Sequence, residues 1–371
     1  MIDVAIVGGG PVGLDLANRL VQAHRTVRVL EKRAAIGTHS RSIGIHPPSL
    51  EMLRETGVTD ELLARGVHIR EGIAYVSGRE AGRIDMRLLP PPFPFVLAIP
   101  QYVTEQVLQD RLPAECITRG VEVTALTQHQ DRVVLQTPDG PVAARFVVGA
   151  DGQHSTVRTL LGIPFRGGAY RDRYLMGDFS DTTDFGERAA IFLDPDGLTE
   201  AFPLPGKIRR WVVRLQDRDD AEADVHRLIH LVRQRTDHRP DPATNTMLSA
   251  FRVYRLLAER LNHGRVILAG DAAHVVSPIG GQGMNVGWLD GRHAAGILQQ
   301  ALDGADHRPL FEAYTRRRRR TARQAARRAE FNMAFGRPGP LAPFMRAGAR
   351  AILWPPLARL AVQRFTMRGL T

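Results

Sequence analysis

The sequence predicts an α/β protein: a Rossmann-like dinucleotide-binding domain that carries an inserted domain with a mixed or antiparallel β-sheet, followed by C-terminal helices. Two observations predict the first domain. An apolar run, Val4 to Val7, leads directly into the glycine-rich turn GGGPVG, and a second glycine-rich segment follows about 270 residues later. The inserted sheet is predicted by short strand-like runs between Ile163 and Arg255, such as Trp211 to Leu215.

The first glycine-rich turn has the spacing of a phosphate-binding loop. Gly8, Gly10 and Gly13 lie between a β-branched strand and a helix predicted to reach about Leu20, so an anion can sit on the amides of the helix N-terminus. A second strand, 26–30, ends at Glu31, where a carboxylate can accept the hydroxyls of an adenosine ribose. The turn therefore predicts a dinucleotide and leaves FAD and NAD both open.

The second glycine-rich segment, 264–287, favours FAD. Its strand, 266–269, ends at Gly270 and Asp271, and a carboxylate there can bind a polyol such as the ribityl chain. Pro278, Gly280, Gly281 and Gly283 then open a helix at about Met284. The positive end of that helix would stabilise the negative charge that reduced flavin carries at its pyrimidine edge. Alone, the segment could equally be a glycine-rich helix start with a capping aspartate.

Three blocks, in order along the chain, resemble the class A FAD-dependent aromatic monooxygenases of the para-hydroxybenzoate hydroxylase type. They are GGGPVG with Glu31, FVVGADGQHSTVR at 146–158, and GDAAHVVSPIGGQGMN at 270–285. By its residues alone the middle block is a turn at Asp151 and Gly152 followed by a helix capped by Ser155. The resemblance implies that this block binds FAD and the nicotinamide cofactor, with Arg158 among its residues. It covers about residues 1 to 335 and is thin between about 163 and 250.

Two looser matches extend the resemblance. The segment 40–58 is similar to the family segment whose arginine reaches FAD, and that arginine corresponds to Arg41. The segment 99–112 is similar to the family segment whose glutamine contacts FAD, and that glutamine corresponds to Gln101. The residues expected to bind the cofactor are Gly8, Gly10, Pro11, Val12, Gly13, Glu31, Lys32, Arg33, Arg41, Gln101, Asp151, Gly152, Arg158, Gly270, Asp271, Pro278, Gly281, Gly283, Met284 and Asn285.

The resemblance implies that NADPH or NADH binds transiently and reduces FAD, and that a flavin C(4a)-hydroperoxide then hydroxylates an aromatic or polyketide-like molecule. Pro278, Gly280 and Gly281 are expected to form the environment of the reactive flavin edge. No acid–base residue is assigned, because His46 and His274 are more typical of structural hydrogen-bonding groups. Since the cofactor carries the chemistry, neither a catalytic triad nor a metal site is expected.

The chain divides, by prediction, into an FAD-binding domain (1–68, 99–162 and 256–335), a substrate domain (69–98 and 163–255) and a C-terminal helical segment (336–371). The stretch 88–99, with Phe93, Phe95, Val96 and Leu97, is expected to form an apolar wall of the substrate pocket. The apolar residues of the C-terminal segment indicate a packed helix pair, a cover for the pocket or a dimer contact.

Composition fits a globular protein, with 43% hydrophobic and 24% charged residues among 371. The single cysteine, Cys116, excludes an intrachain disulfide and is expected to be buried on the helix that follows Val103. No apolar stretch approaches the length of a membrane span and no charged-then-apolar leader opens the chain, so we expect a cytoplasmic location, as a monomer or homodimer.

The net charge of +11 is dominated by arginine, with lysine only at Lys32 and Lys207. The densest run is Arg316 to Arg320, on a helix expected from about Pro309 to Phe335. An exposed helix lying over the cofactor domain explains this run, and an anionic membrane or partner surface is the alternative. Nucleic acid is not expected as a partner, because no aromatic residues interleave with the arginines.

Three other functions fit parts of the pattern. A flavin-dependent halogenase is disfavoured, because no W-x-W-x-I-P segment occurs. A polyprenyl or other alkene reductase of related fold is supported by the apolar C-terminal segment. A non-catalytic FAD-binding protein is the third alternative.

Overall fold

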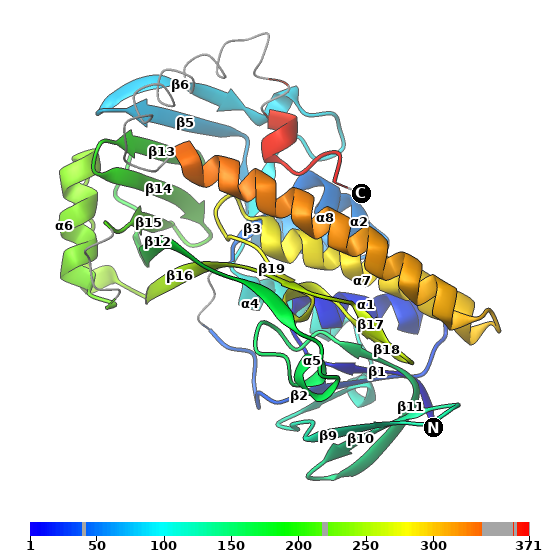
Figure 1. The fold of residues 1–371 in the computed structure, drawn as a ribbon. Coiled ribbons are helices and arrows are strands. Elements are labelled where there is room, and N and C mark those ends of the chain that lie inside the picture. Colours follow the sequence, from blue (N-terminus) through cyan, green and yellow to red (C-terminus); the bar gives the residue numbers. More distant parts are fainter. Residues whose placement is uncertain (39–41, 217–221, 336–358, 360–361, 371) are drawn as a thin grey trace.

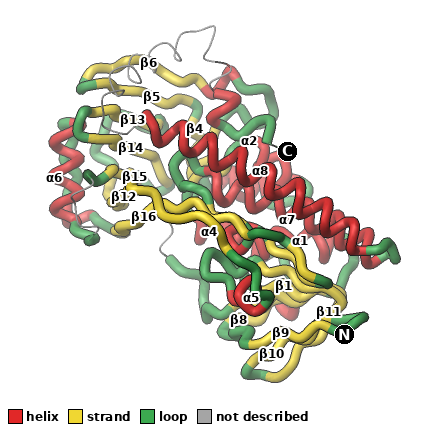
Figure 2. The backbone as a smooth tube through the Cα atoms, viewed as in Figure 1, coloured by secondary structure: helices red, strands yellow, loops and turns green. Residues whose placement is uncertain are grey.

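The computed structural model describes residues 1–38, 42–216, 222–335, 359 and 362–370. Figure 1 shows two sheet regions, with the long helix α8 (His307–Phe335) running diagonally across the molecule from one to the other. In Figure 2 the long strands β12 (Phe165–Ser180) and β16 (Met247–Ala258) reach from the upper sheet towards the lower one. In the described part of the chain, no helix combines the length and apolar character needed to cross a membrane.

The first sheet has a parallel centre. β1 (Ile2–Val7) lies between β2 (Val27–Glu31) and β11 (Gly140–Gly149), both parallel to it. Two more parallel strands flank them, β8 (Ile117–Arg119) and β18 (Val266–Leu268), and three antiparallel strands complete the sheet, β9 (Ala125–Gln128), β10 (Val133–Thr137) and β17 (Asn262–His263). Val4, Ala5 and Ile6 are fully buried, as expected for a central parallel strand covered on both faces.

Helices pack on the first sheet and on one another. α1 (Pro11–Gln22) lies against both α4 (Gln101–Asp110) and α7 (Gln282–Leu302), and α7 lies against α8. Three shorter helices complete this region: α2 (Pro47–Arg54), α3 (Thr59–Arg65) and α5 (Thr156–Leu160). The chain enters α1 through Gly10 and Pro11, and a proline at the first helical position has the backbone angle that a helix needs.

The second sheet has the strand order β19-β16-β12-β15-β14-β13-β5-β6. Its remaining strands are β5 (Glu71–Val76), β6 (Arg79–Asp85), β13 (Ala189–Asp194), β14 (Gly197–Leu204), β15 (Ile208–Arg214) and β19 (His274–Val275). All pairings are antiparallel except β13 with β5, so the sheet is mixed.

One face of the second sheet is covered by α6 (Val225–Thr236), whose Leu228 and Val232 pack with Trp211 and Val213 of β15. Asp224 begins α6 by accepting hydrogen bonds from two backbone amides of the first turn. The alternate residue Val212 of β15 points to the opposite face, towards the cavity described below.

A small third sheet, β3 (Gly44–Ile45), β7 (Val96–Ala98) and β4 (Val67–Ile69), lies between the two larger ones in the cavity wall. Within the described ranges, short 3-10 helices occur at Met86–Leu88, Ala114–Cys116, Pro242–Thr244 and Gly270–Ala272.

The predicted fold class is confirmed: a Rossmann-like region with a mixed sheet and long C-terminal helices. One local expectation is wrong. Cys116 is buried but lies on the 3-10 helix Ala114–Cys116, because α4 ends at Asp110 and Pro113 separates the two. Most of the predicted C-terminal helical segment lies outside the described residues; within it, 362–365 form a helical turn.

Candidate active site

A small pocket of about 200 Å³ lies at the carboxyl ends of β1 and β2. Glu31 lines it and is held by hydrogen bonds from the backbone amide of Gly9, at 2.6 Å, and from the amide and side chain of Arg33, at 2.9 and 3.0 Å. Burial alone would raise the pKa of Glu31, but these hydrogen bonds outweigh it and lower that pKa. The pocket therefore presents a fixed, ionised carboxylate.

The turn beside this pocket depends on a close approach of backbone at Gly13. A Cβ atom there would lie 2.0 Å from the carbonyl oxygen of Gly8, so only glycine lets α1 pack on β1. Gly10 differs, because a Cβ atom on it would meet nothing within 4 Å. It caps α1 without a side-chain hydrogen bond, so the first amides of the helix are left without a partner from the cap residue.

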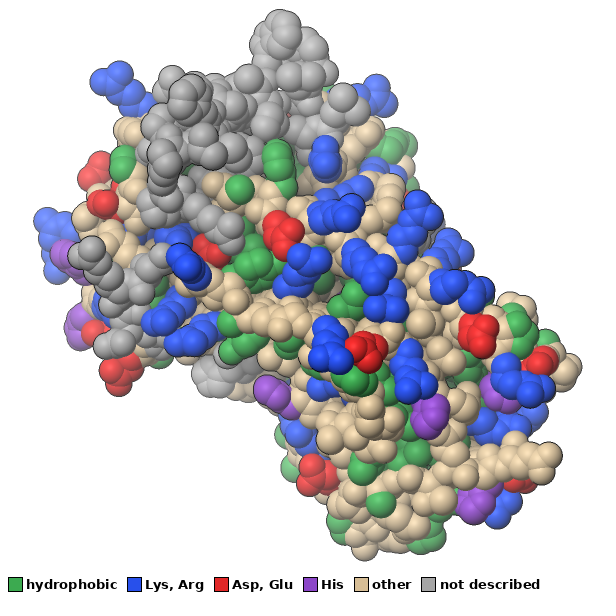
Figure 3. All heavy atoms as spheres, in the orientation of Figure 1, with side chains coloured by type: hydrophobic (Ala, Val, Ile, Leu, Met, Phe, Trp, Pro, Cys, Tyr) green, Lys and Arg blue, Asp and Glu red, His purple; other side chains and the backbone are tan. Residues whose placement is uncertain are grey.

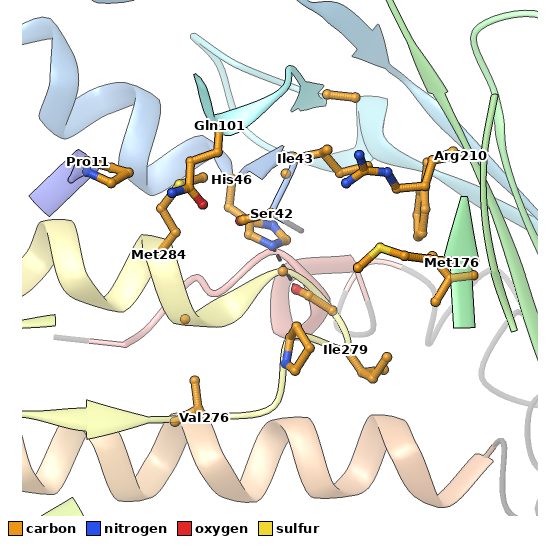
Figure 4. A pocket seen from close by; sticks show the side chains of 18 of the residues that line it. Pro11, Ser42, Ile43, His46, Gln101, Met176, Arg210, Val276, Ile279 and Met284 are labelled. Atoms are coloured by element: carbon orange, nitrogen blue, oxygen red, sulfur yellow. Dashed lines mark hydrogen bonds between the residues drawn. The ribbon is translucent and has the colours of Figure 1, made fainter. Parts of the chain in front are cut away.

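A larger cavity of about 730 Å³ continues from the small pocket, and Gly10, Arg33, Ala150 and Gly152 line both. Figure 4 shows its extent: Pro11, Gln101 and Met284 lie at one end, and Met176 and Arg210 of the second sheet at the other. The first glycine-rich turn, the late glycine-rich segment and the second sheet thus meet in one continuous space. Its volume is in the range of sites that enclose a small molecule.

Asp271 lines the large cavity from the 3-10 helix that follows β18. Its side chain is reached by solvent within the cavity yet surrounded by protein, and burial raises its pKa. Among the described residues, none donates a hydrogen bond to its carboxylate. This carboxylate is therefore available to a ligand hydroxyl.

The loop 278–281 enters the cavity and is fixed from both sides. His46 Nε2 lies 2.9 Å from the carbonyl oxygen of Gly280, a contact drawn in Figure 4. Asn285 accepts a hydrogen bond from the His46 amide at 3.0 Å and donates to the carbonyl oxygens of Gly44 and Gly281 at 2.9 and 2.6 Å. Gly281 has a φ of 66°, in the left-handed region, and begins α7 without a side-chain cap.

His46 is held as the neutral imidazole. Burial lowers its pKa to about 4, against the opposing effect of the Gly280 carbonyl. Its Nε2 therefore donates to that carbonyl, while Nδ1 has no partner among the described residues. The second histidine considered from the sequence, His274, does not line the cavity; its Nε2 lies 2.6 Å from Asp290.

Asp290 of α7 anchors the Asp271 loop from behind. Its Oδ2 accepts a hydrogen bond from the Gly270 amide at 2.9 Å, and its Oδ1 accepts one from Arg318 of α8 at 2.5 Å. Burial opposes ionisation of Asp290, but His274 and Arg318 outweigh that effect and lower its pKa to about 2. Asp290 and Arg318 are both fully buried, so the arginine run of α8 contains one internal residue.

Of the other arginines of this run, Arg319 is half-buried with an enclosed Nε, and the rest are at the surface. Arg316, Arg317, Arg320, Arg323 and Arg327 are exposed, and Figure 3 shows cationic side chains along the course of α8. The expectation of an exposed helix over the cofactor region thus holds for these residues and is wrong for Arg318.

Apolar side chains of the second sheet form the far wall of the cavity, among them Met176, Ile191, Phe202, Val212, Met247 and Phe251. Glu200 of β14 stands among them. The predicted wall at 88–99 is only partly correct. Val96 and Ala98 line the cavity, whereas Leu97 packs into the core, since alternate residues of β7 point to opposite sides. Phe93 and Phe95 precede β7 and also pack into the core.

The structure brings most of the expected cofactor residues to the two cavities. Those that line one or both are Gly8, Gly10, Pro11, Val12, Glu31, Lys32, Arg33, Gln101, Asp151, Gly152, Gly270, Asp271, Pro278, Gly280, Gly281, Gly283 and Met284. Gly13 and Asn285 lie behind the surface and shape it. Arg41 lies outside the described residues.

Arg158 is directed away from both cavities. Its guanidinium donates to the carbonyl oxygens of Ala272 and Gln153 at 3.0 and 2.9 Å and lies 3.9 Å from the centre of the Phe165 ring. These contacts tie α5 to the Asp271 loop. The assignment of Arg158 as a cofactor ligand stays a prediction. Its contacts favour a structural role instead, in which it holds the Asp271 loop against α5.

Several residues of the site were missed from the sequence. Glu105 of α4 lines the large cavity and accepts a hydrogen bond from Gln101 at 2.8 Å, and Phe365 contributes to the cavity wall from the C-terminal segment. A glutamate on the buried side of an amphipathic helix could have indicated Glu105. Nothing in the sequence pairs Asp290 with Arg318. Phe365 supports the pocket-cover interpretation of the C-terminal segment.

Comparisons with known proteins agree with this geometry. Residues 1–329 match the family model described as an FAD binding domain. Rifampicin monooxygenase of Streptomyces venezuelae is 33% identical over 99% of this chain and 78% of its own length. 6-Methylpretetramide 4-monooxygenase of Streptomyces rimosus is also 33% identical, over 85% of this chain, which spans 58% of that relative.

The solved structure of p-nitrophenol 4-monooxygenase from Pseudomonas putida superposes with a TM-score of 0.89 at 26% identity, over 100% of this chain and 99% of that one. The relatives' names support the monooxygenase interpretation and not the reductase alternative. This chain belongs to the FAD-binding, class A aromatic monooxygenase family.

Proposed function

We propose that this protein is an NAD(P)H-dependent flavin monooxygenase that uses O2 to hydroxylate an aromatic or polyketide-like small molecule. The observation that carries the proposal is the single cavity in which the Asp271 loop, the 278–281 loop and the apolar face of the second sheet meet. A cofactor bound along the loops would present its ring to a substrate lying against the sheet.

The residues present fit FAD at both of its ends. The open amides at Gly10 and the start of α1 suit a pyrophosphate, and the ionised Glu31 beside them suits the two ribose hydroxyls of adenosine. Asp271, with no protein donor among the described residues, suits the hydroxyls of the ribityl chain. The continuity of the two cavities lets one molecule reach all three groups.

The ring end of the cofactor would meet the N-terminus of α7. The left-handed Gly281 ends the loop, and the amides of the first helical turn, from Gln282 to Met284, have no partner within the helix. Together with the helix dipole they favour negative charge at the flavin's pyrimidine edge. When bound, FAD supplies the redox chemistry that activates O2.

The protein's own contribution at the substrate end is exclusion of water and orientation of the ring. Apolar residues from β12, β14, β15 and β16 line the cavity together with the 278–281 loop. An aromatic substrate would bury its faces against them, and oxygen transfer would proceed without competing hydrolysis. The names of the relatives, which include a nitrophenol and a polyketide-type substrate, support this class.

The test begins with the colour and FAD content of the purified protein. NADPH and NADH are then compared as reductants under anaerobic conditions, and isotopically labelled O2 is added with a panel of phenols. We expect reduction by one nucleotide, stimulated by substrate, and one labelled oxygen atom in the product. Alkene reduction without consumption of O2 would replace the proposal with the reductase, and no oxidation of either nucleotide would replace it with a non-catalytic FAD-binding protein.

The cofactor assignment has its own test in Asp271→Ala and Asp271→Asn. Removing a charged hydrogen-bonding group costs about 1.5–3 kcal/mol, so we expect FAD affinity to fall about tenfold to a hundredfold in the alanine variant. The asparagine variant keeps an acceptor and should lose less. Asp131→Asn, at a largely exposed turn, is the matched control and should bind FAD normally. Unchanged affinity in Asp271→Ala would remove Asp271 from the site.

A further inference from the structure

Glu200 is a carboxylic acid with an unusual position in the cavity. It lies on β14, is 7% exposed, and lines the cavity on the face of the second sheet opposite α6. Among the described residues, none donates a hydrogen bond to its side chain. A buried polar group is normally paired, so an acid left without a protein partner in a cavity indicates a partner that arrives with the ligand.

The sheet register fixes what surrounds Glu200. Ile191 of β13 and Val212 of β15 are its direct neighbours on the two adjacent strands, and Met176 follows next to Val212. Ile191, Val212 and Met176 also line the cavity. Adjacent strands are about 4.8 Å apart, so the carboxyl group stands in a row of apolar side chains that cannot hydrogen-bond to it.

Among the described residues, none of the other ionisable groups that line the cavity forms a hydrogen bond or ion pair with Glu200. Arg210 lines the same cavity, but its Nε and Nη2 donate to both carboxylate oxygens of Asp178 at 2.6 and 2.7 Å. The other ionisable groups of the sheet side are Arg252 and Tyr254 of β16, and those of the cofactor side are Arg33, His46, Glu105 and Asp271. Burial is the cause that raises the pKa of Glu200 to about 7.

We propose that Glu200 binds the hydroxyl group of a phenolic substrate and accepts its proton. The carboxylate first accepts a hydrogen bond from the phenol. The substrate O–H bond then breaks, an O–H bond forms on the Glu200 carboxyl, and the electron pair stays on the substrate oxygen. This electron pair makes the ring more nucleophilic at its ortho and para carbons, where hydroxylation of a phenol occurs. The inference rests on the proposed function and narrows its substrate to aromatic rings that already carry a hydroxyl.

The acidity of Glu200 suits this role. A base is most effective when its pKa lies near the working pH, because it is then ionised often enough to accept a proton and basic enough to hold it. The raised pKa of Glu200 is close to that of an acidic phenol, so the proton can lie on either partner. An ordinary exposed glutamate would be too weak a base.

The test compares binding of two probes to the FAD-loaded protein without NAD(P)H: 4-methylphenol, and toluene, which has the same ring without the hydroxyl. At pH 8 Glu200 is ionised and 4-methylphenol is still protonated, so we expect the wild-type protein to bind 4-methylphenol about tenfold more tightly than toluene, the worth of one hydrogen bond to a buried carboxylate. Glu200→Gln should lower this preference severalfold and leave toluene binding unchanged. Glu312→Gln, the same chemical change on the exposed side of α8, is the control and should keep the preference.

A second readout detects the proton itself. In alkaline solution 4-nitrophenol and Glu200 are both ionised, and two negative charges cannot share the site, so wild-type binding should take up about one proton per ligand. Glu200→Gln should take up markedly fewer. Calorimetry in buffers of different ionisation enthalpy measures this number.

The outcomes separate the inference from the proposed function. If Glu200→Gln keeps both the preference and the proton uptake while the wild-type protein oxygenates phenols, the role of Glu200 is wrong and the function stands. If the variant loses affinity for both probes equally, Glu200 maintains the cavity and the proposal is overturned. If the wild-type protein oxygenates no phenol and binds neither probe, the proposed substrate class falls and this inference with it.

Discussion

Replacement of Arg318 by methionine tests whether α8 secures the Asp271 loop through a buried charge. Arg318 and Asp290 are both fully buried, and their contact is 2.5 Å long. Methionine keeps most of the side-chain volume and removes the charge, so Asp290 would remain ionised in the interior with only His274 and the Gly270 amide as partners.

The expected magnitude follows from the burial of this pair. Removing one partner of a buried ion pair costs about 3–5 kcal/mol. The entropy of unfolding is about 2.1 cal/mol/K per residue, or roughly 0.8 kcal/mol/K for a chain of this length, so the melting temperature should fall by about 4–6 °C. The assay is thermal unfolding with FAD in excess.

The neighbouring Arg317 offers a matched control, because it is exposed on the same helix. Arg317→Met should change the stability by less than about 0.5 kcal/mol, which is below about 1 °C here. Adding Asp290→Asn to Arg318→Met removes the unpaired charge and should recover part of the loss. Equal melting temperatures for the two single methionine variants would refute the reasoning, since burial would then make no difference.

Two further predictions concern the cofactor end of the site. Gly13→Ala places a methyl group 2.0 Å from the Gly8 carbonyl oxygen, so we expect protein purified with little FAD, measured by the ratio of flavin to protein absorbance. Gly296→Ala, exposed within α7 where a Cβ atom meets nothing within 4 Å, should instead keep its FAD and gain about 0.5–1 kcal/mol. The second prediction concerns pH: burial lowers the pKa of His46 from 6.5 to about 4, so the unfolded chain takes up a proton that the folded protein refuses. The contribution of His46 to the free energy of unfolding is therefore fully present above pH 6.5, and up to about 3 kcal/mol of it is lost as the pH falls to 4. Urea unfolding at several pH values measures this loss, and His46→Gln should not show it. An unchanged pH profile in His46→Gln would contradict the prediction.

The glycine-rich part of the cavity could be predicted from the sequence because its constraints are local. Gly13 must lie against Gly8, and Glu31 must follow a strand, so the spacing of a few residues carries the geometry. Asp271 belongs to the same kind of signal, a strand followed at once by an acid. Each of these residues lies where the pattern placed it, at or directly behind the wall of a cavity.

The cavity wall on the second sheet could not be predicted in the same way, because it is assembled by the pairing of distant strands. Ile191, Glu200, Val212 and Met176 form one row only through the register of four strands, and a shift by one residue would turn each side chain to the other face. The error at Leu97 of β7 has the same origin. An apolar run in a strand identifies two apolar faces and does not tell which one borders the cavity.

The buried position of Arg318 follows from the spacing of apolar residues along α8. Phe311, Tyr314, Arg318, Ala325 and Ala329 recur at spacings of three, four or seven and are all buried, so the arginine lies on the inner face of α8. The five consecutive arginines from Arg316 to Arg320 instead suggested that the whole segment is exposed.

An inner arginine on α8 needs an acid, and Asp290 on α7 supplies it while its other oxygen holds the amide before Asp271. The long basic helix therefore supports the Asp271 loop from the side remote from the cavity. Its Asn332 end also lies against Gly280, where a Cβ atom would come within 2.6 Å of the Asn332 side chain. Helix α8 thus supports both loops that are expected to hold the flavin. We expect that substitution of its exposed arginines disturbs neither loop.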